Sequence, residues 1–324
     1  MSDRCSDTAH ERHRTRPGPY FSIVIAVRNR GHVIMRCLNS ILSQDFRDFE
    51  VLAVDDCSED DTVDVMRGVD DPRLRIVEAK EHAGMWGARC LGIEAARGEW
   101  IIWFDSDDAL VEGALSTFHE RALLAPPEVG VLGASYRDDQ GQITPDPPLP
   151  SGPFGLMECV KWLNEMVRAD YIHVVRRAVL DEVPFPPPKG HGSLFELRVL
   201  ERWRKDVSRD VLGLIYTDCT NRFSGKRSVF RADFVKAVSS QRAEVYEQMD
   251  REYGALLREH APRRYVDVQR SAALMHFLAG HRWRGACRLL RYLARKPLAL
   301  KGWSTLFFGL LGPRALNWAR RNLA

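Results

Sequence analysis

Three carboxylates follow a strongly apolar segment about a third of the way along the 324-residue chain. Trp100–Phe104 is a run of five bulky apolar residues, and Asp105, Asp107 and Asp108 come directly after it. Such a run is typical of a strand buried on both faces, and ligands in open α/β sheets bind where strands end. Because neighbouring carboxylates repel one another, and Mg²⁺ or Mn²⁺ prefers oxygen ligands, the pattern predicts a metal site that presents a diphosphate. The alternative is an acidic loop in which Ser106 or Asp108 caps the next helix.

A second acidic cluster follows the apolar segment Phe49–Val54. Ser58 or Asp60 in this cluster can cap the next helix, which explains part of its polarity. Helix capping does not explain Asp55 and Asp56, which lie directly at the end of the predicted strand. A carboxylate in that position can accept hydrogen bonds from the base or ribose of a nucleotide.

Strands and helices that must position these carboxylates alternate along the first 115 residues. Alternation of this kind is typical of a parallel α/β sheet. A classical dinucleotide fold is disfavoured, because the turn Arg28–Gly31 after the first strand lacks the glycine-rich phosphate-binding pattern. Strands are expected at 21–27, 49–54, 74–77, 100–104, 129–134, 171–175 and 211–216, and helices at 32–43, 88–96, 112–124, 155–168 and 193–205.

Composition and charge describe a soluble globular protein with an uneven charge distribution. Seven scattered cysteines show no metal-ligand spacing and indicate a reduced, cytosolic chain. Residues 1–18 are polar, and we expect a disordered leader without a signal peptide. Residues 262–324 contain 13 Lys and Arg against one acidic residue, a balance of +12, whereas the rest of the chain has a balance of −9.

This basic tail has helical periodicity to its end. Helices are expected at about 229–259, 263–279, 282–295 and 303–322. Arginines at 282, 284, 288, 291 and 295 alternate with apolar side chains such as Trp283. A basic helix with an aromatic face can lie in the headgroup plane of an anionic membrane; the alternative is a helical subdomain with solvated arginines. No nucleic-acid-binding module accompanies the charge, so nucleic acid is not an expected partner.

Residues 20–115 resemble the family 2 glycosyltransferases, which have the GT-A fold. The first strand, the motif Val54–Thr62, the turn and helix around Gly84 and Arg89, and the motif Asp105–Asp108 match that family in order and spacing. The resemblance implies an α/β, mostly parallel, Rossmann-like GT-A sheet flanked by helices. The expected organisation is a leader (1–18), a GT-A domain (19–227) and a basic helical C-terminal region (228–324).

The resemblance also implies a metal-dependent, inverting transfer of a sugar from a nucleotide-diphosphate donor. It assigns Asp55 and Asp56 to the uracil and ribose, Asp105 to the ribose side and Asp107 to Mg²⁺ or Mn²⁺, with Asp108 near the donor sugar. Of the usual turn after the first strand, this chain keeps only Asn29. The expected nucleotide-sugar site consists of Ala26, Arg28, Asn29, Asp55, Asp56, Gly84, Arg89, Asp105, Ser106 and Asp107.

The catalytic base is expected on the late helix. Inverting transfer needs a carboxylate that takes the proton of the acceptor hydroxyl, and the family usually supplies it from a Glu-Asp pair at the start of this helix. Here Leu194 stands at the usual aspartate position, so Glu196 is the expected base. The alternative is a solvated glutamate paired with Arg198 or Lys189.

Two further features of this region have two interpretations each. His191 could be an additional metal ligand or donor contact, since neutral imidazole binds such metals, or an exposed loop residue. The loop 218–226, with Arg222 and Lys226, could close over the diphosphate or be an ordinary linker.

The predicted function is therefore glycosyl transfer from a UDP-sugar, with dTDP and GDP donors left open, to a hydroxyl-bearing glycan, lipid-linked acceptor or small molecule. The expected location is the cytoplasm, with peripheral contact to the inner face of the membrane. Two alternatives remain, a nucleotide-sugar-binding protein without activity and a nucleotidyltransferase.

Overall fold

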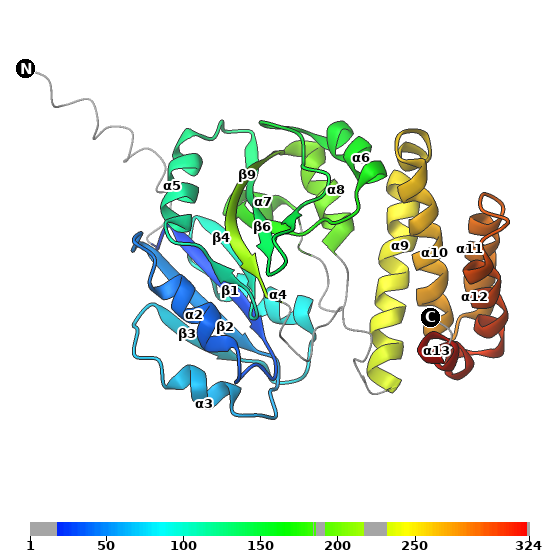
Figure 1. The fold of residues 1–324 in the computed structure, drawn as a ribbon, viewed down its shortest axis with the longest axis horizontal. Coiled ribbons are helices and arrows are strands. Elements are labelled where there is room, and N and C mark those ends of the chain that lie inside the picture. The colour runs from blue at the N-terminus through cyan, green and yellow to red at the C-terminus, as the bar shows by residue number, and fades with distance from the viewer. Residues whose placement is uncertain (1–17, 184, 186–191, 217–231, 323–324) are drawn as a thin grey trace, which may run out of the picture.

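The computed structural model of the chain describes residues 18–183, 185, 192–216 and 232–322. A nine-stranded sheet forms the centre of the first part of the chain, and a bundle of helices follows it (Figure 1). The strand order is β3-β2-β1-β4-β8-β6-β9-β5, and β7 pairs with β6. The strands are β1 (Phe21–Val27), β2 (Phe49–Asp55), β3 (Leu74–Glu78), β4 (Trp100–Asp105), β5 (Ala109–Leu110), β6 (Val129–Asp138), β7 (Ile143–Thr144), β8 (Tyr171–Arg176) and β9 (Arg204–Ile215).

Pairing is parallel on one side of β4 and mixed on the other. β1 pairs in parallel with both β2 and β4, so the carboxyl ends of these three strands lie at one edge. β8 runs antiparallel between β4 and β6, and β6 pairs in parallel with β9. The α/β class predicted from the sequence is confirmed.

Helices cover both faces of this sheet, because its central strands are apolar on both sides. Ile23 and Ile25 of β1 pack into a core with α2 and α5, whereas Val24 packs into a second core with α4 and α8. The helices of this part of the chain are α2 (Ile34–Leu42), α3 (Thr62–Arg67), α4 (Met85–Ala95), α5 (Ala114–Leu124), α6 (Leu156–Glu165), α7 (Arg177–Glu182) and α8 (Gly192–Arg202).

Helix α4 lies unusually close to the sheet. A Cβ atom on Gly92 would be 2.3 Å from Val24 Cγ1 and 3.0 Å from Val54 Cγ2, so only glycine fits there without a shift. This contact fixes the distance between α4 and the strands whose ends carry the carboxylates.

The boundary between α8 and β9 differs from the prediction. The helix ends at Arg202 instead of 205, and β9 begins at Arg204 instead of 211. The first half of β9 is polar, and its pairing with β6 contains register shifts. That segment therefore carries little of the apolar signal from which strands are predicted.

The C-terminal helices form a bundle beside the sheet. α9 (Ala232–His260) packs on α6 and α8 through a core that includes Val160, Leu197 and Tyr253. α10 (Pro262–Leu278) lies behind α9, and α11 (Arg282–Leu293) and α12 (Leu300–Leu311) form the layer farthest from the sheet (Figure 1). The predicted helix 303–322 is two helices, because Gly312 has a φ of 115° and separates α12 from α13 (Pro313–Asn322).

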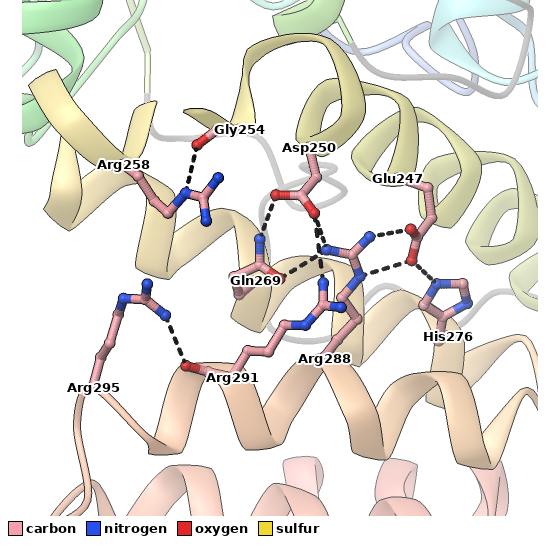
Figure 2. A network of polar contacts seen from close by, with 9 residues as sticks. All are labelled: Glu247, Asp250, Gly254, Arg258, Gln269, His276, Arg288, Arg291 and Arg295. Atoms are coloured by element: carbon pink, nitrogen blue, oxygen red, sulfur yellow. Dashed lines mark hydrogen bonds and ion pairs between the residues drawn. The ribbon is translucent and has the colours of Figure 1, made fainter. Parts of the chain in front are cut away.

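Arg288 holds three of these helices together (Figure 2). Its guanidinium donates from Nε to Glu247 Oε1 at 2.8 Å and from Nη1 to Gln269 Oε1 at 2.9 Å, and it also pairs with Asp250. Although burial raises the pKa of Glu247, hydrogen bonds from Arg288 and His276 lower it to about 2. Arg288 is therefore a buried structural residue, so it belongs neither to the membrane-facing basic helix face predicted from the sequence nor to the solvated arginines of the alternative.

We predict that Arg288→Leu lowers the free energy of unfolding by about 3 kcal/mol, because it leaves two partly buried carboxylates without their shared cation. Arg291→Leu is the matched control. Arg291 is 56% exposed and lies 3.7 Å from Asp250 Oδ2, so its loss should cost under about 1 kcal/mol. Urea denaturation of both variants measures the difference, and equal losses would contradict the structural role of Arg288.

Candidate active site

Strand register brings the two predicted acidic motifs to the same edge of the sheet. Val27 of β1 pairs with Asp55, and Ala26 pairs with Asp105 on the other side. The last residues of β1 therefore lie between the ends of β2 and β4. The two acidic motifs are therefore neighbours at this edge, and that they form one ligand site stays a prediction.

The carboxylate of Asp56 is hydrogen-bonded within the protein. Its carboxylate is buried and accepts hydrogen bonds from the backbone N–H groups of Ala83, at 2.7 Å, and Gly84, at 2.9 Å. His82 Nδ1 lies 2.7 Å from the same carboxylate. Gly84 precedes the first residue of α4 with a φ of 79°, so Asp56 fixes the two residues that lead into this helix and joins them to the end of β2.

Asp55 has a buried oxygen left for a ligand. Its Oδ2 accepts a hydrogen bond from the backbone N–H of Ser58 at 3.0 Å. Its Oδ1 is also buried, but no hydrogen-bond donor among the described residues reaches it. An unpaired buried acceptor is costly in a folded protein, and a nucleobase N–H or ribose hydroxyl would satisfy it.

Asn29 joins the turn after β1 to the turn after β2 by hydrogen bonds. It has a φ of 52°, its backbone N–H donates to Ser58 Oγ at 2.9 Å, and its Oδ1 accepts from the backbone N–H of Glu59 at 2.8 Å. Arg28 extends beside it to Glu59 at 3.5 Å and is partly exposed. Asn29 therefore shapes the site, and Arg28 is partly exposed beside it.

Arg89 connects α4 to the end of β4. Its guanidinium is 8% exposed and donates to Asp105 Oδ1 at 2.6 Å, and it lies 5.0 Å from the ring centre of Trp86. The Asp105 side chain is 50% exposed. One carboxylate of the predicted metal motif is thus oriented by a buried cation while remaining open to solvent.

The other members of this motif continue from the end of β4. Asp107 is half-buried, and its backbone carbonyl accepts a hydrogen bond from Arg36 at 3.1 Å, whereas Ser106 and Asp108 are buried. Burial raises the pKa of the nearby Cys37 thiol, and the carboxylates of the motif raise it further.

A divalent cation fits this donor set. Mg²⁺ and Mn²⁺ are commonly held by one or two carboxylates together with waters and substrate phosphates. Asp105 and Asp107 supply that number. Among the described residues, no group of three or more His, Cys, Asp and Glu side chains has metal-binding geometry, so these residues would hold the ion only in part. His191, Arg222 and Lys226 lie outside the described residues.

Glu196 of α8 lies in a polar cluster with side chains of β8 and β9. Its Oε2 pairs with Lys205 and accepts a hydrogen bond from Tyr171 at 3.0 Å, and its Oε1 lies 3.3 Å from His173 Nδ1. Burial raises the pKa of Glu196, but Lys205 and His173 together hold it well below its usual range. A carboxylate so strongly held in its charged form is a weak proton acceptor, which counts against the predicted base.

Sequence reasoning did not identify Arg36, Trp86 and Lys205 as parts of this region. Arg36 and Trp86 lie on helices that only folding brings to the strand ends. Lys205 begins the polar half of β9, where no strand was expected. No local motif marks any of the three.

Comparison with known proteins gives a consistent result. The family model described as Glycosyl transferase family 2 matches residues 22–184, just over half of the chain. The chain is 39% identical over 113 residues to the succinoglycan biosynthesis protein ExoO of Rhizobium meliloti (strain 1021), covering 35% of this chain and 32% of that protein. It is 35% identical over 107 residues to the GalNAc(5)-diNAcBac-PP-undecaprenol beta-1,3-glucosyltransferase of Campylobacter jejuni, covering 32% and 35%. The chain thus spans about a third of the length of the curated relatives it matches.

Among solved structures, the chain resembles S. aureus TarS 1-349 in complex with UDP-GlcNAc. The TM-score is 0.56 at 18% identity, and the match covers 93% of this chain and 91% of that one. At this identity the likeness concerns the fold alone, and it confirms the expected GT-A fold.

We predict that Asp56→Ala lowers the free energy of unfolding by about 1–2 kcal/mol without any ligand, because the backbone N–H groups of Ala83 and Gly84 lose their carboxylate acceptor. Glu59→Ala is the control in the same loop, since its side chain is 82% exposed and should change stability by under about 0.5 kcal/mol. Thermal unfolding of the ligand-free variants measures both. An Asp56→Ala protein as stable as wild type would assign Asp56 to ligand binding alone.

Proposed function

The chain belongs to glycosyl transferase family 2, and we propose that it transfers a sugar, with inversion, from a nucleotide-diphosphate donor to a hydroxyl group. The observation that carries this proposal is the unpaired, buried Oδ1 of Asp55 at the same sheet edge as the solvent-open Asp105. The Asp55 carboxylate is suited to a hydrogen bond with the nucleoside. The Asp105 carboxylate is suited to a cation at the diphosphate that follows the nucleoside. UDP is the proposed nucleotide.

Binding of the donor would divide among the residues at this edge. Asp55 would accept a hydrogen bond from the base or ribose, with Arg28 and the turn at Asn29 closing the site beside it. Asp107 and the free oxygen of Asp105 would hold Mg²⁺ or Mn²⁺, which supplies positive charge at the leaving diphosphate when bound. Arg89 keeps Asp105 in place and adds a fixed cation nearby.

A sugar carried on a polyprenyl diphosphate is the proposed acceptor class. The Campylobacter relative is named for transfer to a diphosphoundecaprenol-linked acceptor, and the Rhizobium relative for biosynthesis of the polysaccharide succinoglycan. A hydroxyl on such a lipid-linked glycan would attack the donor sugar. The reaction would be a step in polysaccharide biosynthesis.

The outer helices support a membrane surface as a second partner. Trp303, Phe307 and Leu311 of α12 are 47%, 60% and 57% exposed, and they recur every four residues on one face. The opposite face is packed, since a Cβ on Gly309 would lie 2.6 Å from Phe277. Exposed aromatic side chains beside many arginines suit the headgroup region of an anionic bilayer. We propose peripheral binding at the cytoplasmic side.

No helix among the described residues combines the length and the apolar character that crossing a bilayer requires.

We predict that UDP with Mn²⁺ raises the melting temperature, because a ligand that binds only the folded state stabilises it by mass action. UDP, dTDP and GDP are each tested with and without Mn²⁺, and the nucleotide giving the largest shift names the donor class. Asp107→Ala should remove the part of the shift that needs Mn²⁺ and abolish turnover. Glu59→Ala should retain both.

Other outcomes of this experiment separate the alternatives. Binding of UDP with no turnover of UDP-glucose on any acceptor would indicate a nucleotide-sugar-binding protein. Release of pyrophosphate from a nucleoside triphosphate would indicate a nucleotidyltransferase. No shift with any of the three nucleotides would contradict the proposed function.

For the membrane surface, we predict that the triple variant Trp303→Ser, Phe307→Ser and Leu311→Ser binds vesicles of anionic phospholipid at least tenfold more weakly. Each large apolar side chain kept out of the bilayer loses about 1 kcal/mol or more. Leu124→Ser is the matched control, because Leu124 is 83% exposed on α5 of the sheet region. Sedimentation with anionic and zwitterionic vesicles measures binding, and an unchanged triple variant would exclude this face.

A further inference from the structure

The inverting transfer proposed above requires a carboxylate on the acceptor side of the donor sugar, and the inference here rests on that proposed function. The start of α8 does not supply one. Its first residue is Gly192, and its first turn contains no acidic side chain. A Cβ on Gly192 would lie 2.6 Å from Trp86 Cη2, so the indole occupies the space that a side chain at this position would need.

Glu196 is also poorly suited to accept a proton. Lys205, which is 3% exposed, forms an ion pair with the carboxylate, and Tyr171 donates a hydrogen bond to the same oxygen. Protonating Glu196 during a reaction would break this ion pair inside the protein, which is energetically costly. Glu196 therefore acts as the structural partner of Lys205.

Asp170 is the described carboxylate that the sheet places at the reacting edge. It directly precedes β8, which runs antiparallel to β4 with Trp103 opposite His173. The last pair of this register is Trp103 with His173, so Asp170, three residues before His173, lies just before the end of β8 that faces the end of β4. Because β8 runs in the opposite direction, its beginning meets the end of β4.

The surroundings of Asp170 suit contact with an acceptor. Its side chain is exposed, and no hydrogen bond or ion pair joins its carboxylate to another described side chain. The neighbouring Arg168 is occupied by Asp138 at 3.0 Å. The exposed Asp170 carboxylate thus has no ion-pair partner among the described side chains.

We propose that Asp170 is the catalytic base of the transfer. Its carboxylate takes the proton of the acceptor hydroxyl while the hydroxyl oxygen forms a bond to the anomeric carbon of the donor sugar. The bond from that carbon to the diphosphate oxygen breaks, and its electron pair leaves with the nucleoside diphosphate. The antiparallel β8 therefore adds the acceptor-side carboxylate to a site whose donor side is built on the parallel strands.

Asp170→Asn tests this assignment, with Asp181→Asn on α7 as the matched control because Asp181 is also exposed. The assay measures nucleoside diphosphate release from UDP-glucose, UDP-GlcNAc or GDP-mannose with Mn²⁺, using water and GlcNAc-diphosphoundecaprenol as acceptors. We expect kcat of Asp170→Asn to fall at least 100-fold, with the melting-temperature shift by the nucleotide retained. Asp181→Asn should keep both, and Glu196→Gln should keep most of its kcat while losing stability.

The remaining outcomes separate this inference from the proposed function. A wild-type chain that binds and turns over none of the donors overturns both. If the wild type is active and Asp170→Asn keeps its kcat, the base assignment alone is overturned. Loss of the nucleotide-dependent shift in Asp170→Asn would show that Asp170 serves donor binding, which also overturns it.

Discussion

Parallel pairing of β1 with both of its neighbours is the constraint on which the site depends. The register places the ends of β2 and β4 on either side of Ala26 and Val27, so two acidic motifs separated by fifty residues of sequence share one edge. Burial of these strands on both faces keeps that register from slipping, because a shift by one residue would exchange the two cores. The sheet thus concentrates negative charge at a place that only cations and their ligands can stabilise.

Helix α4 converts this edge into an ordered site. Its start is held by Asp56, one turn later Arg89 pairs with Asp105, and the helix lies close to β1 because residue 92 is glycine. The same helix therefore connects the end of β2, at Asp56, to the end of β4, at Asp105. A buried arginine on a rigid helix loses little conformational entropy when it orients a carboxylate, which is an effective way to prepare a site for a charged ligand.

Much of this architecture could be predicted from the sequence, because long apolar strands and their acidic ends are local signals. Asp55, Asp105 and Asp107 were predicted in this way, and the structure places them at or just after strand ends. The proposed role of Asp170 could not be predicted, since its position depends on an antiparallel strand whose partner is 70 residues away. The ion pairs of Arg288 and Glu196 could not be predicted either, because sequence alone does not show which charged side chains meet an opposite charge inside the fold.

The division of labour between the two adjacent aspartates has a consequence for how the protein can evolve. Asp56 is committed to the backbone that leads into α4, whereas Asp55 keeps one buried oxygen without a partner among the described residues. If Asp55 binds the donor as proposed, selection for a new donor can act on Asp55 and the turn around Arg28 without weakening the helix that orients Asp105. Donor preference, through Asp55, and the position of α4, through Asp56, could then change independently in evolution, although the two residues are adjacent in the sequence.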